Sequence, residues 1–267
     1  MPESIERAST DWEGIYENST ESGGWSYLSG VIVRTLLREI RSAEGQSMIE
    51  LGCGSGRNSA RLAALGANVT LLDLSETILD QAEAYFRRKG LSGIFVSGDI
   101  FSIPLLSDKY QVVWNAGVIE HWTGERQVDC IREMLRICRP DGLVITLNPN
   151  KASLHEWGKR ILMHLRLYAY TDEYNILSLK DQAKKAGGYL SKKEYSIGFI
   201  ILFVGFFFQI RTQNLIGRIS YKIFRILNGI LTWLDRSSMG NALYRFDKWL
   251  SKLFGGYLLV SIIQKEV

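Results

Sequence analysis

Several residue types that define particular protein classes are scarce in this 267-residue sequence. Its three cysteines, at positions 53, 130 and 138, show no paired spacing of a zinc site, and they favour reduced residues in a cytosolic protein. The most apolar stretch, 197–210, has 14 residues, short of the roughly 20 that cross a bilayer. Four acids and no apolar run occupy the first 13 residues, so we expect no signal peptide and a cytoplasmic location.

Charge is distributed unevenly along the chain, although the formal net charge is only +4. Residues 1–150 contain 14 Lys and Arg against 20 Asp and Glu, whereas residues 151–267 contain 18 against 8. The two parts are therefore expected to face different partners.

The most informative stretch is 48–58, which reads Met-Ile-Glu-Leu-Gly-Cys-Gly-Ser-Gly-Arg-Asn. Apolar residues lead into an acid and three alternate glycines, and a helical pattern follows, which predicts a buried strand and a tight turn. Glycine suits this turn because it tolerates positive φ and leaves the backbone open to a ligand. A dinucleotide fingerprint needs a glycine at the sixth position, where this sequence has Arg57 or Ser59, so nicotinamide and flavin cofactors are disfavoured.

Three further segments follow the glycine-rich turn at regular spacing. Residues 69–75 predict a strand that ends at Asp73, which lies 17 residues beyond Gly56. Residues 95–100 predict a strand that ends in Gly-Asp-Ile, and residues 110–117 predict a fourth strand. Strands that alternate with helical patterns predict a parallel sheet covered on both faces.

In this order, the run Glu50-x-Gly52-x-Gly54-x-Gly56, the acid Asp73 and the Gly-Asp-Ile segment resemble the class I S-adenosylmethionine (SAM) dependent methyltransferases. The resemblance implies S-adenosyl-L-methionine as cofactor, with Asp73 on the ribose hydroxyls, Asp99 on the adenine amino group and Ile100 against the ring. The cofactor-binding residues that it implies are Glu50, Gly52, Cys53, Gly54, Gly56, Asn58, Asp73, Leu74, Asp99, Ile100, Asn115 and Ala116, the last two through backbone groups.

The resemblance also implies the fold: an α/β, Rossmann-like, doubly wound sheet of seven mostly parallel strands, whose antiparallel last strand lies between strands 5 and 6. The chain then divides into an N-terminal helical or lid segment (1–44), a methyltransferase domain (45–204 plus 256–267) and a helical insertion (205–255). Trp12 or Tyr16 could close over the cofactor or simply pack on the core. Helices are predicted at 28–40, 59–65, 76–89, 127–138, 153–167 and 179–186, a turn at 139–142, and later strands at 143–147, within 189–198 and at 257–264.

Catalytic candidates follow the fourth strand, where Glu120 and His121 lie at the sheet edge that opens onto the substrate. A histidine with a pKa near about 6.5 could deprotonate an acceptor hydroxyl or amine, or it could only hydrogen-bond the pocket. Some quinone O-methyltransferases use a Glu-His pair at this position to help hold a divalent metal. Glu120, His121 and the nearby Glu125 are too few and too scattered to indicate a metal site, and we predict no metal. Asn148-Pro149-Asn150 follows strand 5 and is predicted to end it.

Two basic amphipathic helices are predicted at 216–234 and 243–253. Three roles stay open: packing on the sheet, forming a lipophilic pocket or a membrane contact, and binding a partner. We expect a small-molecule acceptor, a lipophilic one being an option, and no nucleic acid. Peripheral contact with the inner membrane surface through 197–254 is an alternative, and the oligomeric state is not predicted.

The function that this pattern favours is methyl transfer from SAM to an oxygen or nitrogen atom of a small acceptor, for which a hydrophobic molecule is one option. The first alternative is a methyltransferase for a quinone or lipid precursor at the membrane surface. The second is a SAM-binding scaffold without catalysis, which would use 205–255 to dock a partner.

Overall fold

A computed structural model of the chain describes residues 26–154, 176–202 and 215–266, together with the single positions 164, 174 and 204. The candidate lid aromatics Trp12 and Tyr16, and most of the helix predicted at 153–167, lie outside the described residues.

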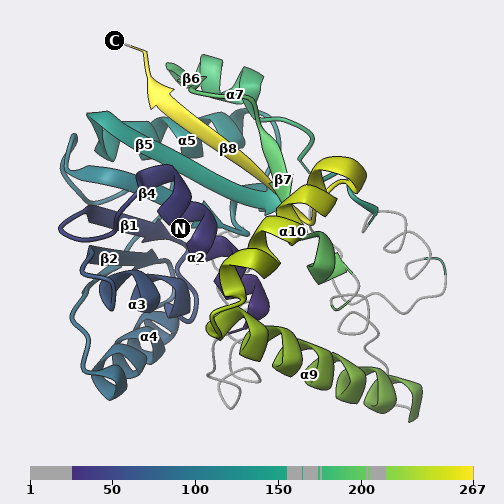
Figure 1. Cartoon of the computed structure of the whole chain (residues 1–267). Helices are drawn as coiled ribbons and strands as arrows, with labels where there is room; N and C mark the ends of the chain where they lie inside the picture. Colours follow the sequence, from purple (N-terminus) through teal and green to yellow (C-terminus); the bar gives the residue numbers. More distant parts are fainter. Residues whose placement is uncertain are drawn as a thin grey trace.

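A single mixed sheet forms the centre of the molecule (Figure 1). Its strands are β1 (Ser47–Leu51), β2 (Asn68–Asp73), β3 (Ile94–Ser97), β4 (Tyr110–Ala116), β5 (Cys138–Pro149), β6 (Gly188–Leu190), β7 (Tyr195–Ile197) and β8 (Leu258–Lys265). Their order is β3-β2-β1-β4-β5-β8-β6, and β7 also pairs with β8. The antiparallel β8 lies between β5 and β6, which confirms the predicted fold. The single sixth strand of the prediction is instead two short strands, β6 and β7.

Helices cover both faces of the sheet (Figure 1). They are α2 (Tyr27–Ile40), α3 (Arg57–Ala63), α4 (Glu76–Lys89), α5 (Glu125–Ile137), α7 (Lys180–Lys185), α9 (Leu215–Arg236) and α10 (Gly240–Phe254), with a 3-10 turn η2 (Ile119–His121). Hydroxyls of Ser26 and Ser75 cap α2 and α4 by accepting backbone N–H groups, and Gly90 ends α4 with φ of 65°.

Two buried apolar clusters lie on opposite faces of the sheet. One joins α2, α3, α4 and α10 to residues such as Trp114 of β4 and Val260 of β8. The other joins α5 and α7 to residues such as Ile49 of β1 and Val144 of β5. Because side chains alternate between the faces of a strand, both faces are buried, as in a doubly wound sheet. The carboxyl ends of β1 to β4 consequently meet at one edge, where ligands bind in such folds.

The turn predicted at 139–142 is wrong, because these residues belong to the beginning of β5. The pairing of β4 with β5 runs from Tyr110 and Cys138 directly to Val112 and Leu143, so residues 139–142 form a bulge opposite Gln111. A Cβ on Gly142 would lie 2.8 Å from the carbonyl oxygen of Gln111, so the close approach of β4 requires glycine there. The Pro-Asp-Gly sequence therefore forms a bulge at the beginning of β5 instead of a turn before the strand.

Candidate functional site

The glycine-rich loop between β1 and α3 is held in a left-handed backbone conformation. Gly52, Gly54 and Gly56 have φ of 63°, 49° and 66°. A Cβ on Gly52 would lie 2.7 Å from Cγ2 of Val118, a residue that follows β4. The loop therefore touches the segment after β4, and only a residue without a side chain leaves room for this contact.

Asp73, at the end of β2, fixes the loop from the neighbouring strand. Its Oδ2 accepts a hydrogen bond from the backbone N–H of Gly54 at 3.1 Å, and its Oδ1 accepts one from Ser75 at 3.2 Å. Burial raises the pKa of the Asp73 carboxyl, and the backbone donors oppose this rise. The acid is thus a structural part of the loop as well as the predicted ribose ligand.

Glu50 lies below the loop and is almost fully buried. Its carboxyl accepts hydrogen bonds from the side chains of Asn58 and Ser59 and from the backbone of Ser59, in the first turn of α3. The residue before this helix, Gly56, has no side chain that could cap it. Glu50 therefore supplies the missing cap from the strand, which favours the interpretation that it organises the turn.

Replacement of Glu50 by glutamine is expected to flatten the pH dependence of stability. Burial raises the pKa of Glu50 from 4.5 to about 8, so between these values the folded chain keeps a proton that the unfolded chain has lost. The free energy of unfolding therefore falls as pH rises through this window, by up to about 1.4 kcal/mol per unit. Urea unfolding at pH 5.5, 7.0 and 8.5 measures the slope. Glu83→Gln, on the exposed side of α4, should keep the wild-type slope, and an equally steep slope for Glu50→Gln would contradict this assignment.

The remaining predicted cofactor residues lie at the same sheet edge. Asp99 follows β3 and accepts the backbone N–H of Phe101 at 2.9 Å, while Ile100 is buried in the core cluster on the α5 side. Leu74 is 36% exposed beside Asp73, which leaves an apolar surface open next to the loop. Cys53 is buried, and burial raises the pKa of its thiol.

The loop of positive-φ glycines, the half-buried Asp73 and the exposed Leu74 fit the amino-acid, ribose and ring parts of SAM in chemical type. The loop offers close backbone approach, the acid offers acceptors for hydroxyl groups, and the leucine offers an apolar contact. These are the residues that would hold the cofactor.

The two catalytic candidates lie in η2, directly after β4. His121 is half-buried, and its ring meets that of Trp122 edge to face, with centroids 6.1 Å apart. Glu120 is buried, and its Oε1 would be 3.4 Å from a Cβ on Gly117. Since Val118 of the same segment touches Gly52, the structure brings the histidine segment and the cofactor loop together.

The sequence predicted a backbone contact of Asn115 with the cofactor, but it did not predict the buried polar side chains on β4 and β5. Asn115, Thr146 and Asn148 are fully buried, and Asn115 is in register with Thr146 across the two strands. Asn115 Oδ1, Thr146 Oγ1 and both polar side-chain atoms of Asn148 have no hydrogen-bond partner. The nitrogen of Asn115 meets the sulfur of Met134 at 3.4 Å, so this side chain faces α5. Buried polar groups without partners are rare and point to a missing ligand or water.

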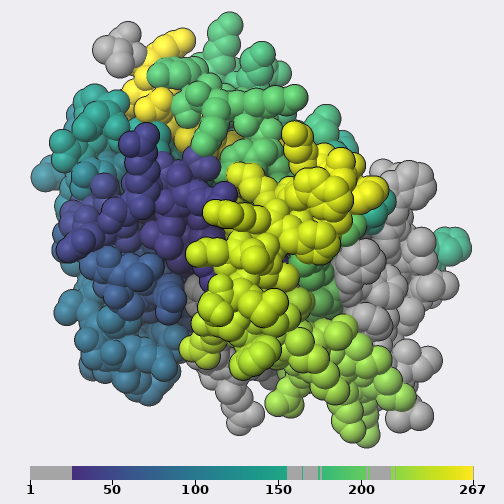
Figure 2. Space-filling view, in the orientation of Figure 1, coloured from purple at the N-terminus to yellow at the C-terminus, as the bar shows by residue number. Residues whose placement is uncertain are grey.

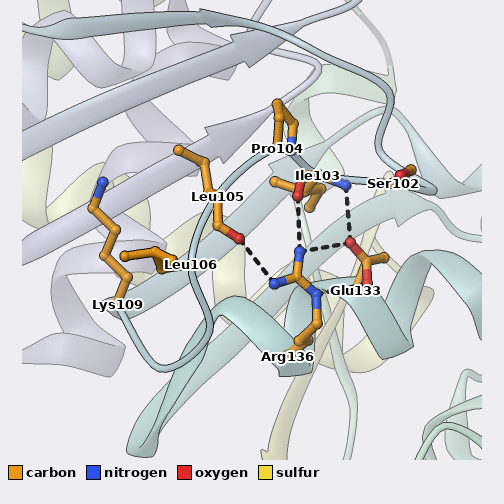
Figure 3. A pocket seen from close by; sticks show the side chains of 8 residues that line it. All are labelled: Ser102, Ile103, Pro104, Leu105, Leu106, Lys109, Glu133 and Arg136. Carbon is orange, nitrogen blue, oxygen red and sulfur yellow. Dashed lines mark hydrogen bonds and ion pairs between the residues drawn. The ribbon is translucent and has the colours of Figure 1, made fainter.

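A surface hollow of about 570 Å³ lies between residues 102–109 and α5 (Figure 3). Arg136 donates to Glu133 and to the carbonyl oxygens of Ile103 and Leu105, at 2.8 to 2.9 Å. Glu133 in turn accepts the backbone N–H of Ile103. The bidentate ion pair of Arg136 and Glu133 fixes the segment after Ile100. Its hydrogen-bonding groups are already paired with each other and with the backbone of this segment.

Comparison with known proteins supports the geometry. Residues 48–142 match the family described as methyltransferase domain. The chain is 31% identical over 121 residues to a malonyl-(acyl-carrier protein) O-methyltransferase of Salmonella typhimurium. The aligned region covers 45% of this chain and 46% of that protein. The chain thus spans less than half the length of this curated relative.

Solved structures extend the likeness of the fold over most of the chain. Magnesium protoporphyrin IX methyltransferase from Synechocystis PCC 6803, with bound SAH, gives a TM-score of 0.56 at 16% identity, over 90% of this chain and 83% of that one. The cyclase SpnF gives a TM-score of 0.57 at 18% identity, over 89% and 81%. At this identity the likeness concerns the fold alone, and the SpnF match shows that the fold does not fix the reaction.

Residues 48–142 therefore match the methyltransferase-domain family, and the chain has the fold of a methyltransferase solved with bound SAH. S-adenosyl-L-methionine, which the glycine loop and its acids predicted from the sequence, is the cofactor that these residues would hold.

Proposed function

We propose that this chain transfers the methyl group of SAM to an oxygen or nitrogen atom of a small acceptor that binds beyond the carboxyl ends of β4 and β5. The observation that carries the proposal is the contact between Gly52 of the cofactor loop and Val118 of the segment after β4. This contact places the residues that would hold the cofactor beside His121, within one edge of the sheet.

SAM supplies a methyl group already activated by a sulfonium, so the chain's own residues have three tasks: to bind, to align and to exclude water. The loop of Gly52 to Gly56 and the carboxylate of Asp73 would bind the cofactor. His121, half-buried in η2, would take the proton from an acceptor hydroxyl or amine. Glu120, buried in the same turn, would orient this segment.

The unpartnered amide of Asn148 would hydrogen-bond a polar group of the acceptor. It lies near the carboxyl end of β5, and the neighbouring Leu147 accepts the backbone N–H of Gly117 at 3.0 Å, next to η2. The amide has both a free donor and a free acceptor. A carbonyl, carboxyl or hydroxyl group on the acceptor would satisfy it.

Substitution of Asn148 by leucine is expected to lower activity while stabilising the fold. Leucine has the same number and branching of side-chain heavy atoms and removes two buried groups without partners, so the free energy of unfolding should rise by about 1–2 kcal/mol. Acceptor turnover should fall at least about tenfold, with unchanged affinity for S-adenosylhomocysteine. Chemical unfolding and methyl-transfer assays measure both effects.

Asn150→Leu is the matched control, two residues along the chain. Asn150 donates to the carbonyl oxygen of Gly256 at 3.1 Å and accepts from the N–H of Ala152 at 3.0 Å. This variant should therefore lose stability. If Asn148→Leu were destabilised as much as Asn150→Leu, Asn148 would be a structural residue and its acceptor role would be discarded.

Two classes of acceptor are separated by one screen with methyl-labelled SAM. Small lipophilic phenols, amines and quinone precursors form the first class. A malonyl group on an acyl-carrier protein forms the second, which the 31% identity to an enzyme of that name favours. Transfer of the labelled methyl group to a compound of one class identifies that class as the acceptor. Intact S-adenosylhomocysteine binding without label in any acceptor would favour the scaffold function and contradict the proposal.

A further inference from the structure

The outer surface of α9 and α10 is unusually apolar. Ten of the eighteen large apolar side chains that are exposed in the described part of the chain lie within the 40 residues from 215 to 254. They are Ile219, Tyr221, Ile226, Ile230, Trp233, Met239, Phe246, Trp249, Leu253 and Phe254. Figure 2 shows the two helices, light green to yellow, lying on the surface of the molecule. A monomeric protein rarely exposes so many neighbouring apolar side chains without a function for them.

Basic residues accompany these apolar side chains on the exposed sides of both helices. Six basic side chains are exposed: Arg218, Lys222, Arg225, Arg236, Arg245 and Lys252. The sequence of α9 and α10 has only two acids, Asp235 and Asp247, and both are buried. The outer face of α9 and α10, as defined by these exposed basic and apolar residues, therefore carries positive charge without acidic counterparts.

Packing does not explain this arrangement, because the inner side of the helices uses other residues: Tyr244 in the core cluster and two acids in polar contacts. Arg34 of α2 binds the carboxylate of Asp235, with Nε and Oδ1 2.9 Å apart, and also donates to its backbone carbonyl. Asp247 accepts the N–H groups of Gly198 and Ile200, each at 2.8 Å. The acids point inward beside the core-packed Tyr244, whereas a second set of apolar side chains points outward, which a helix that only covers a core does not need.

Helical spacing brings the apolar and basic groups together. Ile219, Ile226, Ile230 and Trp233 recur at intervals of three, four and seven residues, which places them on one side of α9. The basic residues of α9 form the adjoining stripe on the same exposed half. On α10 the rings of Phe246 and Trp249 stack with centroids 6.0 Å apart.

We propose that the outer face of α9 and α10 binds the surface of a bilayer that contains anionic lipid. A helix that exposes aliphatic and aromatic side chains beside Lys and Arg lies in the plane of such an interface, where tryptophan is favoured and cations meet headgroups. Within the described residues, no helix has both the length and the apolarity required to span a membrane. The contact is therefore peripheral, and it is independent of the reaction proposed above.

Other occupants fit the same surface less well. A second copy in a symmetric contact would place six exposed cations against six others, without an exposed acid on either helix. A nucleic acid would contact mainly the basic residues, because phosphate contacts dominate the affinity of proteins for nucleic acids. The exposed side chains of Ile226 and Ile230 would then have no partner. An acidic protein would meet the charges, but it would need a matching apolar row.

Vesicle co-sedimentation of the whole chain tests the charge component. We expect binding to phosphatidylcholine vesicles that contain phosphatidylglycerol, and at least tenfold weaker binding to phosphatidylcholine alone. Each basic residue near an anionic surface contributes roughly fivefold, so Arg218→Gln, Lys222→Gln and Arg225→Gln together should weaken binding about 100-fold. The matched control neutralises three exposed basic residues at the end of α4: Arg87, Arg88 and Lys89. It should bind as the wild type does.

Tryptophan quenching by brominated lipid tests the apolar component. Trp233 and Trp249 are 68% and 55% exposed, so brominated acyl chains should quench the wild type. Phenylalanine at both positions should abolish most of this quenching while binding is retained, and serine at both positions should weaken binding at least tenfold. The control variant carries serine at Ile94 and Leu106, which are exposed on other parts of the surface. It loses two apolar side chains outside α9 and α10 and should bind vesicles as the wild type does.

Equal binding by the wild type and the α9 triple variant would overturn the proposal, as would equal affinity for neutral and anionic vesicles. Binding of RNA or of an acidic carrier protein through these residues, without vesicle binding, would also overturn it. The same holds for a dimer in sedimentation velocity that the double serine variant converts to monomer while vesicles are not bound.

Discussion

Alanine at position 52 is expected to abolish cofactor binding and to destabilise the fold. The alanine would have to keep the backbone φ of 63°, and its Cβ would lie 2.7 Å from Cγ2 of Val118. A valine side chain is stiff and cannot move aside without shifting the segment after β4. The left-handed conformation and the overlap together should cost about 2–5 kcal/mol of unfolding free energy. Affinity for S-adenosylhomocysteine should fall more than about 100-fold in calorimetric titration.

Gly45→Ala separates the two causes. Gly45 has φ of 72°, but no atom lies within 4 Å of an added Cβ, so this variant carries the backbone strain without the overlap. It should lose about 1–2 kcal/mol and bind the cofactor normally. Adding Val118→Ala to Gly52→Ala should recover part of the lost stability. If Gly52→Ala were no worse than Gly45→Ala, the contact between the loop and the segment after β4 would be refuted.

Replacement of Asp73 by alanine is expected to remove cofactor binding while the protein still folds. The carboxylate fixes the N–H groups of Gly54 and Ser75, and losing both bonds should cost about 1–3 kcal/mol of stability. Partial burial raises the pKa of the Asp73 carboxyl because desolvation is unfavourable to its charged form, and this limits the loss of stability. Because the same group would accept the ribose hydroxyls, affinity for S-adenosylhomocysteine should fall about 100-fold or more.

Thermal unfolding and titration on the same sample distinguish binding from folding. Asp80→Ala, on the exposed side of α4, should leave both quantities unchanged. Near-normal affinity in Asp73→Ala would mean that the cofactor does not depend on this acid, and the assigned site would need another ribose ligand.

The parts of the fold that the sequence predicted best are those determined by local patterns. The buried strand before Gly52, the acid that ends β2 and the helix predicted at 76–89 each follow from a few adjacent residues. The position of β8 between β5 and β6 came from the family resemblance, because no local pattern specifies which strands pair across the chain.

The features that the sequence did not predict depend on contacts between distant residues. The partners of Glu50, on the first turn of α3, follow from the close approach of that helix to β1. The unsatisfied amide of Asn148 follows from complete burial at a strand end, whereas a local pattern marked it only as a strand terminator. A polar residue within the apolar β5 was the available signal. Likewise, periodicity showed that α9 has an apolar stripe but not that Ile226 and Trp233 face outward.

The central claim is that the loop of Gly52 to Gly56 with Asp73 forms a SAM site. The most direct test is calorimetric titration of the purified protein with S-adenosylhomocysteine, with NADH as the control ligand. We expect saturable one-to-one binding of S-adenosylhomocysteine in the micromolar range or tighter, and no heat of binding with NADH. Binding of NADH, or of neither ligand by a folded protein, would contradict it.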